Sequence, residues 1–170
     1  QHLGPGHLVA IDPTEAMLRR ARENVHATGM ADRVELQQAS AEGLPFPDAS
    51  FDVVVSSIAL HHTTVRRSLP EIARVLKPGG RLAIADMSLP GRWRGCLRLL
   101  LPPITGLYYL LVKWSIPMAR AEMAALRQVF AKEEWEAMLY EAGFSSVEVQ
   151  EFRHPTREWL PAMLIIRAGK

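Results

Sequence analysis

The chain has 170 residues, 48% of them hydrophobic and 22% charged, with a formal net charge of +2 at pH 7. This is the composition of an ordinary globular domain, not of a disordered or strongly nucleic-acid-binding protein. The lone cysteine, Cys96, excludes an internal disulfide and a cysteine-based zinc site. We therefore expect one cytoplasmic domain, residues 1–170, with no nucleic-acid partner and no metal site.

The first part of the chain predicts a strand, a helix and a second strand. Residues 7–11 are a short apolar strand that ends in Asp12, and Thr14 is a good N-cap for a helix that Gly29 stops. Residues 34–38 then alternate apolar and polar side chains, as a short strand does.

The next part repeats this order. Residues 51–58 are β-branched and nearly all apolar, which indicates a strand covered on both faces. An amphipathic helix follows and stops at Lys77-Pro78-Gly79-Gly80, and residues 81–87 form the next strand. Alternating strands and helices predict an α/β fold with a mostly parallel sheet and right-handed crossovers.

Residues 88–131 break this alternation with a segment rich in Leu, Pro, Trp and Tyr, and we expect a helical insertion there. Residues 97–112 are nearly all apolar, but prolines and a glycine interrupt them, and they fall short of the roughly 20 residues of a membrane-spanning helix. After a helix over 132–142, strands at 147–152 and 163–167 predict an antiparallel edge of the sheet.

Asp12 is the first candidate site residue. An acidic side chain at the carboxyl end of a strand in a nucleotide-binding sheet accepts hydrogen bonds from ribose hydroxyls. The alternative is that Asp12-Pro13-Thr14 only starts a helix, and for this tripeptide alone that alternative is favoured.

Two longer motifs favour the ligand-binding interpretation of Asp12 over helix initiation alone. The first is Ala41-Glu42-Gly43-Leu44-Pro45-Phe46-Pro47-Asp48-Ala49-Ser50-Phe51-Asp52-Val53-Val54, and the second is Ile72-Ala73-Arg74-Val75-Leu76-Lys77-Pro78-Gly79-Gly80-Arg81-Leu82. Together they resemble the class I S-adenosylmethionine-dependent methyltransferases, in particular the small-molecule group with a type 11 domain that includes the ubiquinone and menaquinone C-methyltransferases. The resemblance implies a Rossmann-like sheet, S-adenosyl-L-methionine as cosubstrate, and an insertion after the family's fifth strand.

The resemblance also implies roles for individual residues. Asp12 would bind the cosubstrate ribose, Ser40 and Ala41 the adenine end, and Ser57 would line the cosubstrate pocket. The family often has Asp or Asn at the position of Ser40, and a hydroxyl accepts a weaker hydrogen bond than a carboxylate. The alternative for Ser57 is a small core residue bonded to a neighbouring carbonyl.

His61 and His62 follow the apolar strand, near the point where the transferred methyl group is expected. If the acceptor is a phenol, a hydroxyl or an activated ring carbon, a base with a pKa near neutrality helps to remove its proton. Either histidine is a candidate for that base. The alternative is that both only cap or pack the next helix.

The insertion is expected to determine which acceptor binds. Its aromatic and aliphatic residues would roof a pocket for a small apolar acceptor of quinone-like or lipid-like kind, with peripheral membrane contact as an extension of this hypothesis. An ordinary helical cover over one face of the sheet is an equal alternative. The residues in question are Trp93, Leu99, Tyr108, Tyr109 and Trp114.

One family feature has no counterpart in this sequence, namely a first strand followed by a glycine-rich loop that approaches the methionine part of the cosubstrate. We therefore expect an N-terminally incomplete methyltransferase domain. The flanking strands would then close up directly, receive a strand from another chain, or leave the domain poorly folded. A cooperative melt together with micromolar binding of S-adenosylmethionine would contradict this expectation.

Two other functions remain open at the level of sequence. The missing glycine loop favours a non-catalytic, methyltransferase-like remnant that acts as an interaction module. A nicotinamide-dependent dehydrogenase also has an acidic residue after its second strand. However, the sequence has no Gly-x-Gly-x-x-Gly loop, so the dehydrogenase ranks third.

Overall fold

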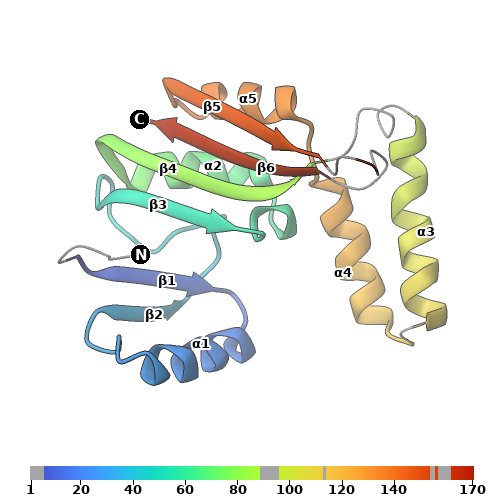
Figure 1. Cartoon of the computed structure of the whole chain (residues 1–170), viewed down its shortest axis with the longest axis horizontal. Coiled ribbons are helices and arrows are strands. Elements are labelled where there is room, and N and C mark those ends of the chain that lie inside the picture. Colours follow the sequence, from blue (N-terminus) through green and yellow to red (C-terminus); the bar gives the residue numbers. More distant parts are fainter. Residues whose placement is uncertain (1–5, 89–95, 113, 154–155, 157–161) are drawn as a thin grey trace.

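The computed structural model describes residues 6–88, 96–112, 114–153, 156 and 162–170. The elements of the first half are β1 (Leu8–Asp12), α1 (Glu15–Ala27), β2 (Val34–Gln38), β3 (Phe51–Ser57), the 3-10 helix η1 (Leu60–His62), α2 (Val65–Val75) and β4 (Leu76–Ser88). Those of the second half are α3 (Cys96–Val112), α4 (Ile116–Arg127), α5 (Lys132–Glu141), β5 (Ser146–Phe152) and β6 (Ala162–Gly169). The expected α/β fold is confirmed (Figure 1).

The larger sheet has four strands in the order β3-β4-β6-β5. β3 and β4 run parallel, whereas β6 pairs antiparallel with both β4 and β5. The last two strands therefore form the expected antiparallel edge, with β6 inserted next to β4.

β1 and β2 form a separate parallel pair, with Leu8 opposite Val34 and Asp12 opposite Gln38. Figure 1 shows β1 next below β3 and pointing the same way, yet in the described part of the chain no backbone hydrogen bond joins them. Direct closure of these two strands, one of the three outcomes expected from the sequence, is therefore not what the structure shows. The incompleteness of the domain stays a prediction.

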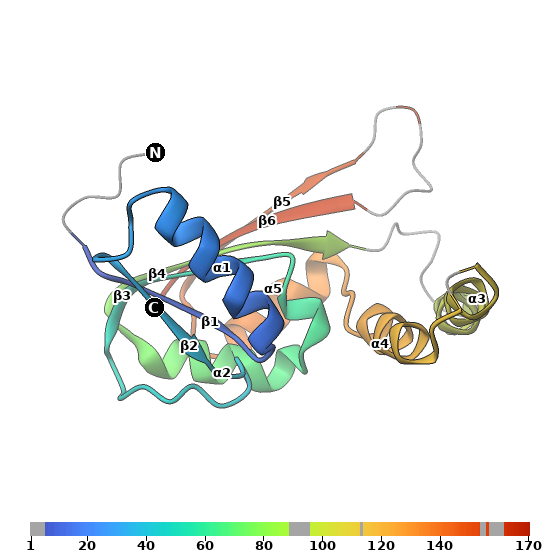
Figure 2. The same cartoon turned by 90° about the horizontal axis from the view of Figure 1, so that it is seen from below.

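The core lies between the four-stranded sheet and helices α2 and α5. Its largest fully buried side chains include Trp135 of α5, Leu69 of α2, Leu82 and Ile84 of β4, and Leu164 of β6. In contrast, Leu18 is the one buried hydrophobic residue among the described residues 6–59. Figure 2 shows α1 on the opposite side of the strands from α2.

The helices around the core follow the predicted patterns. The apolar stripe of α2 is buried. On α5, the buried face contains Trp135, Met138 and Leu139. α5 is followed by Gly143, whose φ of +94° belongs to the left-handed region that glycine adopts without strain. Thr14 is the N-cap residue of α1, but its side chain makes no capping hydrogen bond.

The structure corrects the prediction for β3. This strand was expected to be covered on both faces, but Val53 is 48% exposed and Val55 is 71% exposed. The reason is that α2 and α5 cover only one face of the larger sheet, and no described element covers these two valines.

β4 also differs from the prediction, because it begins at Leu76 and not after the glycine pair. Leu76 pairs with Phe51, and the register then shifts so that Arg81 pairs with Val53. The intervening residues bulge out of the ladder at Gly79, which has a φ of +77°. A Cβ at Gly80 would lie 2.8 Å from the carbonyl oxygen of Lys77, so this turn requires glycine twice.

The expected helical insertion contains α3 and α4, which pack against each other. Gly106 of α3 is buried at their contact, where an added Cβ would collide with Met123 of α4. The Ser115 hydroxyl accepts a hydrogen bond from the backbone N–H of Met118 (3.3 Å) and so caps α4. α4 in turn contacts η1, which joins the insertion to the end of β3.

Candidate functional site

The candidate residues lie along one edge of the molecule, at the carboxyl ends of the parallel strands. Asp12 ends β1, Ser40 and Ala41 follow β2, and Ser57 ends β3. His61 and His62 follow in η1. In Figure 1 this edge faces α4, and ligands of open α/β sheets bind at such strand ends.

Asp12 forms the turn into α1 and keeps part of its carboxylate accessible. Its Oδ1 accepts a hydrogen bond from the backbone N–H of Thr14 (2.7 Å), which fixes the turn into α1. Its Oδ2 has no hydrogen-bond partner within the described residues, and the side chain is only half-buried. One carboxylate oxygen therefore starts the helix while the other stays open to a ligand.

Ser40 is committed to its own turn. Its hydroxyl oxygen accepts a hydrogen bond from the backbone N–H of Glu42 (3.2 Å), and Ser40 forms an isolated bridge with Gly43. Ala41 is half-buried and packs against the core. Ala41 thus offers backbone groups at a fixed place, whereas the Ser40 hydroxyl is already partly occupied.

Arg74 and Glu71 of α2 anchor the loop after β2. The Arg74 guanidinium donates to the backbone oxygens of Phe46 (2.8 Å) and Leu44 (2.9 Å), and also to the carboxylates of Asp48 and Glu71. Glu71 accepts a further hydrogen bond from the backbone N–H of Leu44 (2.9 Å). Arg74 and then this N–H lower the pKa of Glu71 to about 2.

Glu42 connects the same loop to the start of α2. Its Oε1 accepts a hydrogen bond from the backbone N–H of Thr64, the N-cap residue of α2 (2.8 Å). The carboxylate satisfies a donor at the amino end of the helix, where negative charge is favourable. The loop after β2 is therefore attached to the four-stranded unit through side chains.

Ser57 lies at the exposed end of β3, and the chain then turns sharply into η1. Ile58 has a φ of +50°, a strained conformation for a β-branched residue, and its N–H donates to the carbonyl oxygen of Ala85 (2.7 Å). This turn directs the following His61 back under the sheet. The exposure of Ser57 disagrees with the alternative that it is a core residue.

His61 forms a buried pair with Asp86, near the carboxyl end of β4. The distance between His61 Nδ1 and Asp86 Oδ1 is 2.6 Å, and the two side chains are 4% and 0% exposed. Asp86 also accepts hydrogen bonds from the backbone N–H groups of His61 (3.2 Å) and Met87 (2.8 Å). A carboxylate oxygen at this place can accept a hydrogen bond from Nδ1–H, and in the neutral imidazole with its proton on Nδ1 the acceptor nitrogen is Nε2.

His62 lies against His61, with ring centroids 4.1 Å apart. Partial burial, followed by the proximity of His61, lowers the pKa of His62, while Glu122 of α4 and Asp86 act in the opposite direction. A lowered pKa keeps His62 mostly neutral at pH 7. The two histidines thus differ in environment, because His61 is buried and paired with Asp86 whereas His62 is more exposed.

Asp86 was not among the site residues predicted from the sequence. Its signal was available, since Asp86 is the one charged residue in the apolar run Leu82-Ala83-Ile84-Ala85-Asp86-Met87. A charge in a buried strand needs a partner or a function. Arg74 was noticed only as part of a family motif and Glu71 was not noticed at all, because contacts with a loop about 28 residues earlier in the chain cannot be inferred from local spacing.

The expected roof over an acceptor pocket is not formed by the described residues. Leu99 is 76% exposed and Trp114 89%, Tyr108 is also exposed, and Tyr109 packs edge-on against Tyr108. Trp93 lies outside the described residues. Leu99, Tyr108 and Trp114 are thus exposed to solvent.

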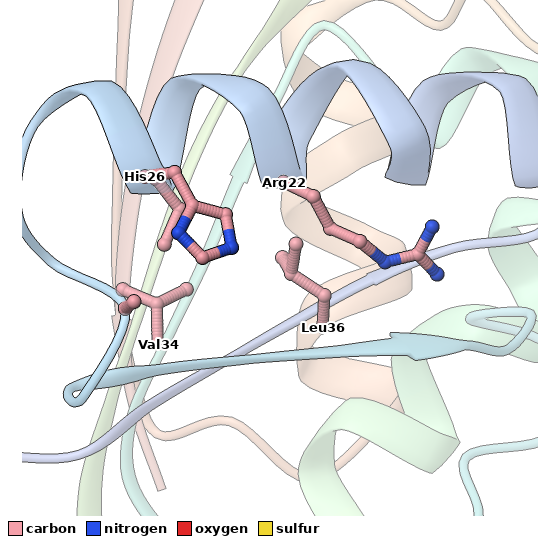
Figure 3. A pocket seen from close by; sticks show the side chains of 6 residues that line it. Arg22, His26, Val34 and Leu36 are labelled. Carbon is pink, nitrogen blue, oxygen red and sulfur yellow. The ribbon is translucent and has the colours of Figure 1, made fainter.

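A small open pocket lies elsewhere, between α1 and β2 (Figure 3). Arg22 and His26 of α1 line it together with Val34 and Leu36 of β2. It lies along the helix–strand contact and not at the strand ends, so it does not belong to the candidate site. Within the described part of the chain, no group of three His, Cys, Asp or Glu side chains is placed to hold a metal ion.

Comparison with known proteins agrees with this geometry. A family model described as a methyltransferase domain matches residues 1–84. Residues 1–84 therefore resemble this methyltransferase domain family. The resemblance noted in the sequence is thereby confirmed.

A curated relative, the ubiquinone/menaquinone biosynthesis C-methyltransferase UbiE of Escherichia fergusonii, is 43% identical over 86 residues. The match covers 50% of this chain and 34% of the relative, so the chain matches about a third of the length of that methyltransferase. The residues that the family model matches, 1–84, include the six site residues predicted from the sequence, whereas Asp86 and the insertion lie beyond them.

The fold itself extends over nearly the whole chain. A SAM-dependent methyltransferase from Aquifex aeolicus superposes with a TM-score of 0.62 at 22% identity, covering 96% of this chain and 69% of the other. The [4+2]-cyclase SpnF superposes with a TM-score of 0.72 at 18% identity, covering 97% of this chain and 66% of the other. Identities this low show the Rossmann-like methyltransferase fold alone, and the cyclase shows that one fold serves different chemistries.

Proposed function

We propose that the protein containing this chain is an S-adenosylmethionine-dependent methyltransferase that acts on a small, apolar acceptor of quinone-like or lipid-like kind. The observation that carries this proposal is the buried pair of His61 and Asp86. It lies at the same sheet edge as the Asp12 carboxylate, of which only one oxygen accepts a hydrogen bond within the described residues. An acid that orients the cosubstrate and a base at the strand ends suit a methyl transfer in which the acceptor also loses a proton.

The residues at the edge fit the adenosine half of the cosubstrate. Asp12 Oδ2 is available to a ribose hydroxyl, and the loop after β2 offers the backbone groups of Ala41 to the adenine. Ser57 is exposed at the end of β3, where it would line the pocket between them. When bound, S-adenosylmethionine supplies an electrophilic methyl group.

The role of His61 is to accept the proton that the acceptor loses. Asp86 holds the Nδ1 proton and the ring orientation, so Nε2 is the atom that receives it. Asp86 is a positioning residue in this scheme, because it acts through His61. His62, partly exposed and mostly neutral at pH 7, lies beside the base without adding a second positive charge.

Titration of the 170-residue protein with S-adenosylhomocysteine, followed by NMR, tests cosubstrate binding. We expect saturable shifts of the amides of Asp12, Ala41 and Ser57, with an affinity weaker than micromolar because the sequence shows no glycine-rich loop. Asp12→Ala should abolish the shifts. The matched control is Asp32→Ala, since Asp32 is exposed and lies at the amino end of β2, away from the candidate edge.

The break between β1 and β3 favours one competing function, a non-catalytic remnant that binds another protein. The same titration separates the two. A remnant shows no shifts with either S-adenosylmethionine or S-adenosylhomocysteine, whereas shifts that survive Asp12→Ala would contradict the binding mode proposed here.

A further inference from the structure

The insertion presents an unusually apolar surface to solvent. We name it the hairpin surface, and its members are all exposed large hydrophobic residues of α3, the following turn and the start of α4. They are Leu99, Leu100, Ile104, Leu107, Tyr108, Leu110, Leu111, Trp114, Ile116 and Met118. Soluble domains rarely expose so many neighbouring apolar side chains unless they dock on something.

The contact between the two helices fixes the direction of this surface. Gly106 and Pro102 of α3 are buried, and Gly106 is where Met123 of α4 comes closest. At 3.6 residues per turn, the exposed members on α3 occupy about half of the helix circumference, an arc that begins beside Gly106 and is centred roughly 110° from it. Figures 1 and 2 show α3 at the end of the molecule, beyond α4 as seen from the sheet.

Charge distinguishes this part of the chain from the rest. Residues 87–121 contain no acidic residue and five basic ones, whereas the remaining 135 residues contain 15 basic and 18 acidic residues. The basic residues are Arg92, Arg94, Arg98, Lys113 and Arg120. An apolar surface inside a purely basic segment is complementary to an anionic lipid surface, which offers both negative headgroups and an apolar interior.

We propose that the hairpin surface docks on a bilayer that contains anionic lipid, with α3 lying in the plane of the interface. Trp114 and Tyr108 are the side chains suited to the headgroup level, since each combines an apolar ring with a polar atom. No described helix is long and apolar enough to cross a membrane, so contact is peripheral. A second copy is a poorer occupant, because it would bring two segments of equal positive charge together.

This inference rests on the proposed function in one respect, namely that His61 lies where the acceptor binds. The helix α4 contacts η1, which contains His61. Docking of the hairpin would therefore hold the edge with His61 near the membrane, where an apolar acceptor is dissolved. Binding to lipid itself requires neither cosubstrate nor acceptor, so its failure would leave the proposed methyl transfer untouched.

Flotation with vesicles tests the docking. The full 170-residue protein is mixed with vesicles of phosphatidylcholine alone or of phosphatidylcholine with phosphatidylglycerol. We expect binding to the second kind, a bound fraction that falls as salt is raised, and a blue shift of tryptophan emission that Trp114→Phe removes. The double variant Leu107→Glu/Leu111→Glu should lose at least tenfold in binding.

The matched control is Met17→Glu/Tyr140→Glu, which adds the same charge at exposed helical positions of α1 and α5. Far-UV circular dichroism verifies that both double variants are folded. Absence of binding to phosphatidylglycerol vesicles, or equal loss in the control, would overturn the proposal. A concentration-dependent dimer that only Leu107→Glu/Leu111→Glu dissociates would also overturn it, in favour of a second copy as the occupant.

Discussion

The parts of the molecule on either side of the gap between β1 and β3 are stabilised very differently. The four-stranded sheet with α2 and α5 contains nearly all of the buried core, including Trp135 and Leu164. The β1–α1–β2 unit buries Leu18 alone among its described hydrophobic residues, and no ladder hydrogen bonds connect it to β3. The candidate site is therefore divided between a stable part, with His61 and Asp86, and a weakly held part, with Asp12.

The largest expected difference between the two parts concerns their cores. Trp135→Ala should lower the free energy of unfolding by about 3–5 kcal/mol, because it opens a large cavity beneath the sheet. Leu18→Ala should leave the main unfolding transition much less affected, since the unit that it weakens opens separately. Urea denaturation followed by far-UV circular dichroism measures both, and equal losses in the main transition would show that the two parts unfold as one.

Asp86→Asn should cost about 1–3 kcal/mol, because it weakens a buried, charge-assisted hydrogen bond to His61. It should also remove the preference for the Nδ1–H tautomer of His61, which ¹⁵N NMR of the imidazole reports. The control Asp52→Asn breaks the exposed pair with Lys77 and should cost less than about 1 kcal/mol. An unchanged tautomer in Asp86→Asn would contradict the positioning role of Asp86.

The stabilisation that Glu71 contributes, through the loop between the two parts, depends on pH. Its pKa is about 2 in the folded protein and near 4.5 in the unfolded chain, so its stabilisation is complete above about pH 4.5 and is lost as pH falls towards 2. Glu71→Gln should cost about 1 kcal/mol at pH 7, and this difference from the unsubstituted protein should shrink across that range. Urea unfolding at several pH values measures it, with Glu35→Gln on β2 as the control that should show no such trend.

The smallest expected effect lies inside the weakly held unit. Gln38 Nε2 donates a hydrogen bond to the carbonyl oxygen of Pro13 (2.9 Å) and ties the end of β2 to the turn before α1. Gln38→Ala should lower the local opening free energy of β1 and β2 by about 0.5 kcal/mol while leaving the main transition unchanged. Gln37→Ala, one residue earlier, is the matched control, and an equal effect there would exclude a role for this hydrogen bond.

The sequence predicted the order of the elements well, because each has a local signal. The apolar stripe of α2, the shared face of Trp135, Met138 and Leu139, and Gly143 after α5 are all short-range patterns. Exposure of Val55 was not predictable in this way, since an apolar strand looks the same whether or not a helix covers it. Periodicity identifies a strand but not its neighbours.

The candidate site was predictable only in part. Asp12, Ser40, Ala41, Ser57, His61 and His62 were chosen from strand ends and family motifs, and the structure places them along one edge. Their roles stay predictions. The pairing of His61 with Asp86 joins residues 25 positions apart, and such contacts depend on the register of β3 and β4, which no local pattern specifies.

Hydrogen exchange followed by NMR, with and without S-adenosylhomocysteine, tests the division of the site most directly. Without ligand, we predict that amides of β1 and β2 exchange through a lower free energy of opening than those of β4 and β6. With ligand, β1 and β2 should become more protected while β4 and β6 change little, because binding stabilises the weakly held unit. Equal protection of all four strands without ligand, or no added protection of β1 and β2 with it, would contradict the account.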